Sequence, residues 1–486
     1  MKIRLLVALV VATAGCSAGN GDTGAPAVAH APAALITITS RSPQAVERYR
    51  KGEELFFNAR IPEAAAEFSE ALTLDPDFAL AHMMHGQSIP GSEGVAEVES
   101  AAAASASLPE PERLLIAGAL ADRRGETVKG RETAVRLTQV APGDWRSHNM
   151  LGLFLFGERK FADAVQALRK ATELNRQAGS AHNALGYAAL RQGDTSGAIA
   201  AFAEYARVMP QEPNAQDSLG EALMAAGRFD EAEAAFRKAE QLSPQFWSAE
   251  QGIAYARFFA GDVAGARAAL MKAREIAPRP VDKVDLDDVL AALAAAQGNM
   301  AEALRVLAAS EQTADALPSV AFVSLRRAMV LVDMKRYRES LPLIAAATER
   351  ADGGQLPENV SRELRRQALC ARVAAEAGLA DAASAQRTAA ALTEAAKARA
   401  DDLNAQSSMQ YGQGMLAMVN GDAASARAHF EQCLKDDYYC RLQMVAAADK
   451  AGDKAGAEAA RAELLKLFVR DPVHVLVRSR LTRPAR

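Results

Sequence analysis

Apolar and small residues recur along this chain with the spacing of paired amphipathic helices. Within residues 213–246, such residues stand three or four positions apart in two successive stretches, and Gly227 separates the stretches. The same arrangement occurs 34 residues earlier, where Phe202 corresponds to Phe236 and Gly193 corresponds to Gly227. We therefore expect helical hairpins that repeat every 34 residues, each with a glycine in its turn.

The residue types at the repeated positions fit close packing between the two helices of a hairpin. A small residue in the first helix and an alanine in the second let the helices approach, and a large apolar residue four positions later fills the space to the next hairpin. The pattern stays in register over four consecutive units, with weaker copies on both sides. The recurring residues of these units are Leu151, Gly152, Ala164 and Leu168; Leu185, Gly186, Ala198 and Phe202; Leu219, Gly220, Ala232 and Phe236; and Gly261, Ala266 and Leu270.

This pattern resembles the tetratricopeptide repeat (TPR) family at that family's own period, over roughly residues 45 to 470. The resemblance implies an all-α fold, a right-handed α-solenoid of about twelve helical hairpins that follows a signal peptide and a flexible linker. We expect degenerate hairpins over 43–144, consensus repeats over 145–280, degenerate hairpins over 281–470 and a C-terminal tail over 471–486.

The N-terminus carries an export signal. Lys2 and Arg4 precede a short apolar run, which is too short to span a bilayer, and small residues then lead to Cys16. This stretch resembles a bacterial lipobox, although Thr13 stands where that family usually has Leu. The resemblance implies a signal peptide over 1–16, lipidation of Cys16, and an exported lipoprotein that faces the periplasm or the cell surface, with Ser17 favouring the outer membrane. The alternative is a cleaved signal with an incidental cysteine.

The composition of the rest of the chain adds two expectations. Residues 17–42 are expected to form a flexible linker, because their first half is rich in Gly, Ala, Ser and Pro. Export exposes cysteines to oxidising conditions, so Cys433 and Cys440 are candidates for a disulfide; the alternative is that both are small buried residues.

Charge and motifs exclude several classes of function. A net charge of −4, from 56 basic and 60 acidic residues, offers no basic surface for nucleic acid. No zinc-hydrolase or phosphate-loop motif occurs, and the pair His82 and His85 lacks an evident third metal ligand. We therefore expect no catalytic site, cofactor, metal or small-molecule substrate, and no membrane contact beyond the lipid anchor.

The residues that the repeat does not require lie at positions 2, 5 and 9 of the first helices, which share one face. Amides, hydroxyls and tyrosine rings at these positions suit an extended peptide, because they pair with its main chain and cover its side chains. The alternative is that they only solvate an exposed face. The candidate groove residues are Arg146, Asn149, Ser180, Asn183, Tyr187, Asn214, Asp217, Glu221, Gln251 and Tyr255.

The sequence thus predicts an exported scaffold that binds a protein or an extended peptide in the groove of its repeats. Two alternatives from other classes remain open. The first is a self-assembling structural component of an envelope or secretion complex. The second is a hydrolase whose unrecognised site lies in residues 281–486.

Overall fold

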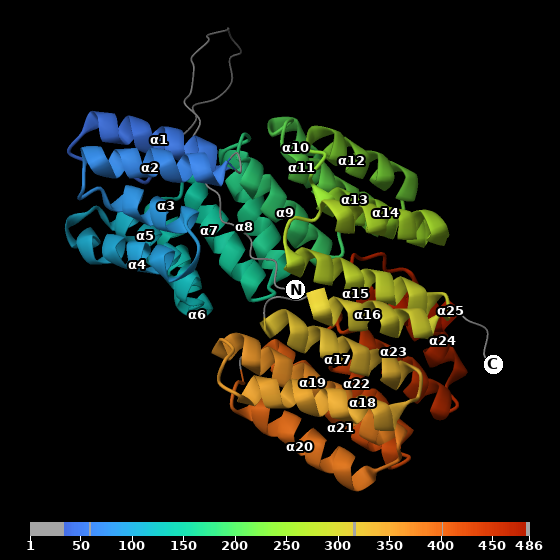
Figure 1. Ribbon diagram of the computed structural model, residues 1–486. Helices are drawn as coiled ribbons and strands as arrows, with labels where there is room; N and C mark the ends of the chain where they lie inside the picture. Colours follow the sequence, from blue (N-terminus) through green and yellow to red (C-terminus); the bar gives the residue numbers. More distant parts are fainter. Residues whose placement is uncertain (1–33, 58–59, 314–316, 401, 483–486) are drawn as a thin grey trace, which may run out of the picture. The chain divides into compact units, whose positions relative to one another are not determined.

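The computed structural model describes residues 34–57, 60–313, 317–400 and 402–482, and over these residues the fold is an all-α solenoid of helical hairpins (Figure 1). The predicted fold class is confirmed. The chain divides into two compact units, Met1–Leu242 and Ser243–Arg486, so the division falls inside the predicted block of consensus repeats. The signal peptide and Cys16 lie outside the described residues.

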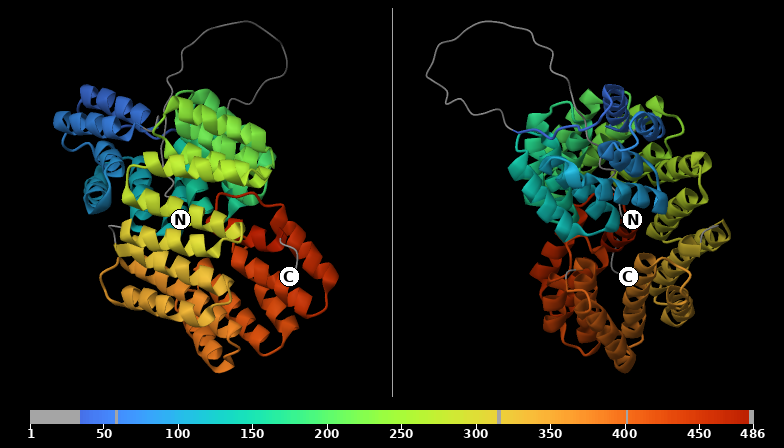
Figure 2. Two further views of the ribbon diagram at one scale, coloured as in Figure 1. Left: turned by 45° about the vertical axis from the view of Figure 1, so that its right-hand side comes forward. Right: turned by 90° about the vertical axis from the view of Figure 1, so that its left-hand side faces the viewer.

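The first unit holds six hairpins among its described residues, and consecutive hairpins lie side by side in chain order (Figure 2). A short 3-10 helix, Ser105–Ser107, follows α4. The helices are α1 (Pro43–Phe57), α2 (Ile61–Leu74), α3 (Ala79–Ser88), α4 (Gly91–Ala104), α5 (Glu110–Arg124), α6 (Thr127–Val140), α7 (Trp145–Gly157), α8 (Phe161–Leu174), α9 (Gly179–Gln192), α10 (Thr195–Val208), α11 (Pro213–Ala225) and α12 (Phe229–Leu242).

The second unit holds six further hairpins and a final single helix within the described ranges. Its helices are α13 (Trp247–Ala260), α14 (Val263–Ile276), α15 (Pro280–Ala296), α16 (Met300–Thr313), α17 (Leu317–Asp333), α18 (Tyr337–Asp352), α19 (Glu358–Gly378), α20 (Ala382–Lys397), α21 (Leu403–Val419), α22 (Ala423–Glu431), α23 (Tyr438–Lys450), α24 (Lys454–Leu465) and α25 (Pro472–Thr482).

Close contact between the two helices of a hairpin explains the repeated glycines. A Cβ atom on Gly220 would lie 2.7 Å from the ring of Phe236, and one on Gly186 would lie 2.5 Å from the ring of Phe202. Both rings are completely buried, so neither could move aside cheaply. Gly193 ends α9 with φ of 93°, a left-handed conformation that favours glycine and turns the chain into α10.

Both ends of the described chain differ from expectation. Residues 34–42, expected as part of a flexible linker, form an extended segment whose Ile36 is buried. Residues 472–482, expected within a tail, form the helix α25, which packs against α15 and buries Val475, Leu476 and Val477 (Figure 1). In both segments apolar side chains are buried, which a solvated linker or tail would not achieve.

Candidate functional site

The predicted groove residues lie on the first helices of four successive hairpins. Those on α7, α9 and α11 belong to the first unit, whereas Gln251 and Tyr255 lie on α13 in the second unit. The two groups are therefore described separately.

In the first unit, the chain's own residues 34–42 lie across the hairpins; we call this segment the N-terminal strap. The strap has the alternation of an extended chain, in which Ile36 is buried and its neighbours Leu35 and Thr37 are exposed. Ile36 belongs to the hydrophobic core cluster of the unit, and Ile38 packs against that cluster. The strap thus contributes apolar side chains to the core through every second residue.

Asp144 and Arg146 bind both polar groups of Ile36. The N–H group of Ile36 donates to Asp144 Oδ2 at 3.1 Å, and Arg146 Nη2 donates to the carbonyl oxygen of Ile36 at 3.0 Å. Asp144 is the N-cap of α7 and also accepts from Arg146 Nε at 2.9 Å, which fixes the guanidinium plane. Arg146, at position 2 of its repeat, therefore recognises main-chain atoms of an extended segment.

Two further carboxylates bind the strap. Glu112, in the first turn of α5, accepts from the hydroxyl groups of Thr37 and Thr39, each at 2.5 Å, and from Thr39 N at 3.2 Å. Asp75, directly after α2, accepts from Ser40 Oγ at 2.5 Å and from Arg41 N at 2.8 Å.

The electrostatics of Asp75 fit this role. Burial alone would raise the pKa of Asp75, but the hydrogen bonds from Ser40, Arg41 and the backbone of Asp77 together outweigh burial and lower it. The strap therefore supplies donors to acceptors that belong to three different hairpins.

Arg146 belongs to a buried cluster of charged and polar side chains. Glu53 Oε1 lies 3.6 Å from Arg146 Nη1 and accepts from the hydroxyl group of Tyr49 at 2.7 Å. Burial raises the pKa of Glu53 to about 7, although Arg146 opposes this shift. Burial alone would lower the pKa of Arg146, but Asp144 and Glu53 raise it above its usual value.

On α9 and α11 the predicted residues form a half-buried polar network. Tyr187 Oη lies 3.2 Å from Ser218 Oγ and donates to Glu221 Oε2 at 3.4 Å, while Ser218 Oγ donates to Asn183 Oδ1 at 3.4 Å. The structure thus brings together Asn183, Tyr187 and Glu221 from two hairpins. Ser218 was missed by sequence reasoning, because it falls beside the predicted positions rather than on them. We call Asn183, Tyr187, Ser218 and Glu221 the α9–α11 polar patch.

Other predicted residues take different places. Asn149 and Asp217 are 1% and 4% exposed, so they lie beneath the face and are not available to a ligand on it. Ser180 is half-buried on α9, and Asn214 Nδ2 donates to Tyr205 Oη at 3.5 Å, toward α10. Position 5 is thus buried on α7 and α11, whereas Asn183, at the same position of α9, is half-buried.

In the second unit, the chain's own C-terminal segment covers the predicted face of α13. Arg470 Nη2 donates to Ser248 O at 2.8 Å, to Ser248 Oγ at 2.9 Å and to Gln251 Oε1 at 3.0 Å. Tyr255 is only 2% exposed, and Phe468 packs edge-on against Phe259 of the same helix with ring centroids 5.3 Å apart. The prediction that Tyr255 lines the groove is therefore wrong, whereas Gln251 is half-buried and accepts a hydrogen bond from Arg470.

α25 completes this cover. His474 is buried between the rings of Tyr438 and Phe259, and burial lowers its pKa to about 4, so the ring is neutral at neutral pH. Arg480 forms an ion pair with Asp333 at the end of α17. The cover is held by apolar packing and by charge.

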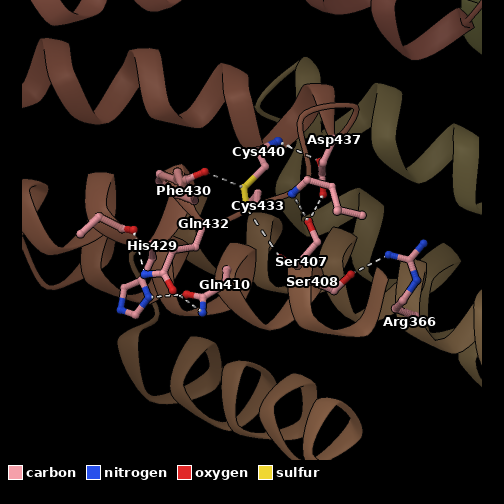
Figure 3. The surroundings of a disulfide bond; sticks show 12 residues. Arg366, Ser407, Ser408, Gln410, His429, Phe430, Gln432, Cys433, Asp437 and Cys440 are labelled. Carbon is pink, nitrogen blue, oxygen red and sulfur yellow. Dashed lines mark hydrogen bonds between the residues drawn. A yellow bond between two sulfur atoms is a disulfide. The ribbon is translucent and has the colours of Figure 1, made fainter. Parts of the chain in front are cut away.

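Cys433 and Cys440 form a disulfide, with their Cα atoms 6.4 Å apart (Figure 3). The bond joins the residues after α22 to the first turn of α23. Asp437 is the N-cap of α23: its Oδ1 accepts from Cys440 N, and its Oδ2 accepts from Ser407 Oγ. Figure 3 shows these groups around the disulfide, which secures the last hairpin to its neighbour.

The described residues offer no group of three or more His, Cys, Asp or Glu side chains that could hold a metal ion. His82 and His85 both face Glu97, with His82 Nδ1 2.6 Å from Glu97 Oε1. Within the described ranges, no helix combines the length and apolar character that a bilayer crossing requires.

Stacked hairpins with a polar face of first helices define a helical-repeat protein. Family models of the tetratricopeptide repeat match residues 149–218 and 223–293, so the chain contains tetratricopeptide repeats, as the sequence resemblance predicted.

Several solved structures are similar to parts of the chain. One is the crystal structure of a tetratricopeptide repeat protein from Parabacteroides merdae, which is 14% identical with a TM-score of 0.41 and aligns over 54% of this chain and 99% of that one. The crystal structure of MamA is 23% identical with a TM-score of 0.31, over 33% of this chain and 93% of that one. YrrB, described as a TPR protein with an unusual peptide-binding site, is 14% identical with a TM-score of 0.30, over 43% and 92%. No curated protein sequence matches the chain.

Proposed function

We propose that this protein is an exported, lipid-anchored scaffold that binds extended segments of partner proteins along the first helices of its N-terminal unit. The observation that carries the proposal is the capture of Ile36, whose N–H and carbonyl groups are both hydrogen-bonded by the pair Asp144 and Arg146. Because these contacts involve main-chain atoms, they do not depend on the side chain of the bound residue.

The α9–α11 polar patch extends this chemistry to the next two hairpins. It presents the amide of Asn183, the hydroxyl group of Tyr187 and the carboxylate of Glu221, which together donate and accept hydrogen bonds, while the hydroxyl group of Ser218 is buried beneath them. Tyr187 also packs edge-on against Phe202 with ring centroids 5.0 Å apart, so its ring is held in place by the core of its own hairpin. A rigid aromatic ring with a polar rim provides contact area at a low cost in side-chain entropy.

The experiment that tests the proposal is selection of peptides from a random library on the purified chain. We expect the selection to yield peptides that bind the intact protein. These peptides should bind the Tyr187→Ala and Glu221→Gln variants at least about tenfold more weakly, a loss of about 1.4 kcal/mol or more in binding free energy. The matched control is Glu204→Gln on α10, where an exposed carboxylate forms an ion pair with Arg207 of its own helix. Selection of no peptide, or equal affinity for all variants, would contradict the proposal.

The export and anchoring parts of the proposal rest on the N-terminal sequence. Cys16 follows a short apolar run and small residues, in the arrangement of a lipobox. Seventeen residues, 17–33, separate this cysteine from the first residue of the strap, which gives the repeats a tether from the membrane.

A further inference from the structure

We propose that the trough beneath the N-terminal strap is itself a binding site for a partner segment that alternates β-branched apolar residues with hydroxyl residues, and that the strap occupies this site as an intramolecular competitor. The trough is formed by Asp75, Glu112, Asp144 and Arg146. The inference rests on the proposed function and specifies the ligand at one part of the same face.

The charges of the trough determine which side chains it accepts. Its three carboxylates can only accept hydrogen bonds, and its single guanidinium group is already paired with Asp144 at 2.8 Å. An entering segment must therefore bring donors, and aspartate or glutamate facing Glu112 would be repelled at close range. Threonine and serine bring a hydroxyl donor without an added charge that burial would penalise.

The spacing of the contacts determines the conformation of the segment. Glu112 takes the hydroxyl groups of Thr37 and Thr39, which are two residues apart and so lie on one side of an extended chain. Ile36 and Ile38 alternate with them and pack against the core cluster. The sequence Ile-Thr-Ile-Thr-Ser of residues 36–40 therefore represents the motif that the trough recognises.

The strap is held in the manner of a bound peptide. Residues 34–40 adopt no helix or strand, and their hydrogen bonds to the hairpins go to groups on or beside α2, α5 and α7. One main-chain contact, from Gly143 N to Ala34 O at 3.4 Å, is long and weak. Because a short tether gives an effective concentration of about 1 mM, weak contacts suffice to keep the strap bound until a competitor displaces it.

The test separates the strap from its trough after the protein has folded. A protease recognition sequence is inserted between Arg41 and Ser42 of the full chain, so that Ser42 still accepts from Ala45 N at the start of α1. The cut and uncut forms are then titrated with a labelled synthetic peptide of residues 34–42. We expect the cut form, freed of its N-terminal fragment, to bind this peptide at least about tenfold more tightly than the uncut form.

Matched controls connect the binding to the proposed contacts. A peptide carrying Thr37→Val and Thr39→Val should bind the cut form at least about tenfold more weakly, because Glu112 loses both hydroxyl donors. Glu112→Gln in the cut form should weaken the parent peptide, whereas Glu110→Gln on the same turn, which pairs with the exposed Arg136, should not.

Equal affinity of the cut and uncut forms, no binding to the cut form, or tolerance of the valine peptide would overturn the inference. Light scattering that shows dimers of the uncut form which dissociate on cutting would also overturn it, in favour of strap exchange between copies. Failure of the proposed function would give a different result: the library would yield no peptide whose binding depends on Tyr187 and Glu221. These two residues lie outside the trough.

Discussion

The carboxylate of Glu53 lies 3.6 Å from the guanidinium group of Arg146, and both side chains are almost completely buried. Despite this cation, burial raises the pKa of Glu53 to about 7 from an ordinary value of 4.5. Arg146 does not cancel this increase in the pKa of Glu53, because Asp144 is the closer partner of Arg146 at 2.8 Å and adds a second negative charge to the cluster. The hydrogen bond from Tyr49 and the positive charge of Arg50 favour the ionised form of Glu53, but they do not outweigh burial.

This relationship makes the stability of the first unit depend on pH. Between about pH 4.5 and pH 7 the folded state keeps the proton of Glu53 while the unfolded state has lost it, so the contribution of Glu53 is complete below this window and is lost as pH rises through it. We expect Glu53→Gln to remove this loss, so that from pH 5 to pH 8 the variant gains on the order of 3 kcal/mol in free energy of unfolding relative to wild type. Denaturant titrations over this range provide the measurement. Glu54→Gln, at the exposed neighbouring position, is the control, and a parallel pH profile for both variants would contradict the account.

The close packing within hairpins predicts a strong contrast between two glycines of α7. A Cβ atom on Gly152 would lie 2.5 Å from Leu168 Cγ, whereas one on Gly157 would meet only Thr127 Cγ2, at 3.7 Å. We expect Gly152→Ala to lower the free energy of unfolding by about 1–3 kcal/mol, because the core must shift, and Gly157→Ala to be neutral or slightly stabilising. Thermal unfolding of both variants checks this, and equal effects would show that the hairpin does not pack as described.

The cover over α13 predicts that one arginine secures the C-terminal helix. Arg470→Ala removes three hydrogen bonds to Ser248 and Gln251, so we expect faster hydrogen exchange throughout α25 and along the exposed side of α13. Lys466→Ala, on an exposed residue just after α24, serves as the control. Unchanged exchange in α25 after loss of Arg470 would mean that apolar packing and the ion pair between Arg480 and Asp333 hold the cover without Arg470.

Lipid anchoring predicts a simple change in distribution between cell fractions. Cys16→Ser removes the only atom to which a lipobox could attach lipid, so we expect the protein to move from the membrane fraction to the soluble exported fraction. Ser17→Ala, at the next position, should leave the membrane fraction unchanged. A membrane fraction that persists after Cys16→Ser would show that the protein is retained by other contacts.

The fold could be predicted from the sequence because consecutive hairpins of the central repeats share the same local requirement. Gly186 with Phe202 and Gly220 with Phe236 encode one packing geometry at one spacing, and such a signal accumulates along the chain. The weak copies near the ends still form helices because the same small and apolar residues recur there.

The candidate site could be predicted only in part, because burial of a polar residue depends on segments far away in the sequence. Asn183, Tyr187 and Glu221 were found from their position on the first helices. In contrast, Arg146 is covered by residue Ile36 across 110 positions of sequence, and Gln251 is bound by Arg470 across 219. No periodicity in the repeats encodes these contacts, since the covering segments lie outside the repeats. The alternation of isoleucine and threonine in residues 36–39 was the available signal for the strap.

The measurement that tests the central claim most directly is the affinity of a library-selected peptide for Glu221→Gln and Glu204→Gln, compared with wild type by fluorescence anisotropy. Glu221 accepts from Tyr187 within the α9–α11 polar patch, whereas Glu204 lies on the second helix of its hairpin and pairs with Arg207. If the first helices bind extended segments, the peptide should bind Glu221→Gln at least about tenfold more weakly and Glu204→Gln as tightly as wild type. The claim would be contradicted if the peptide bound Glu204→Gln more weakly and Glu221→Gln normally, or if it bound both variants as tightly as wild type.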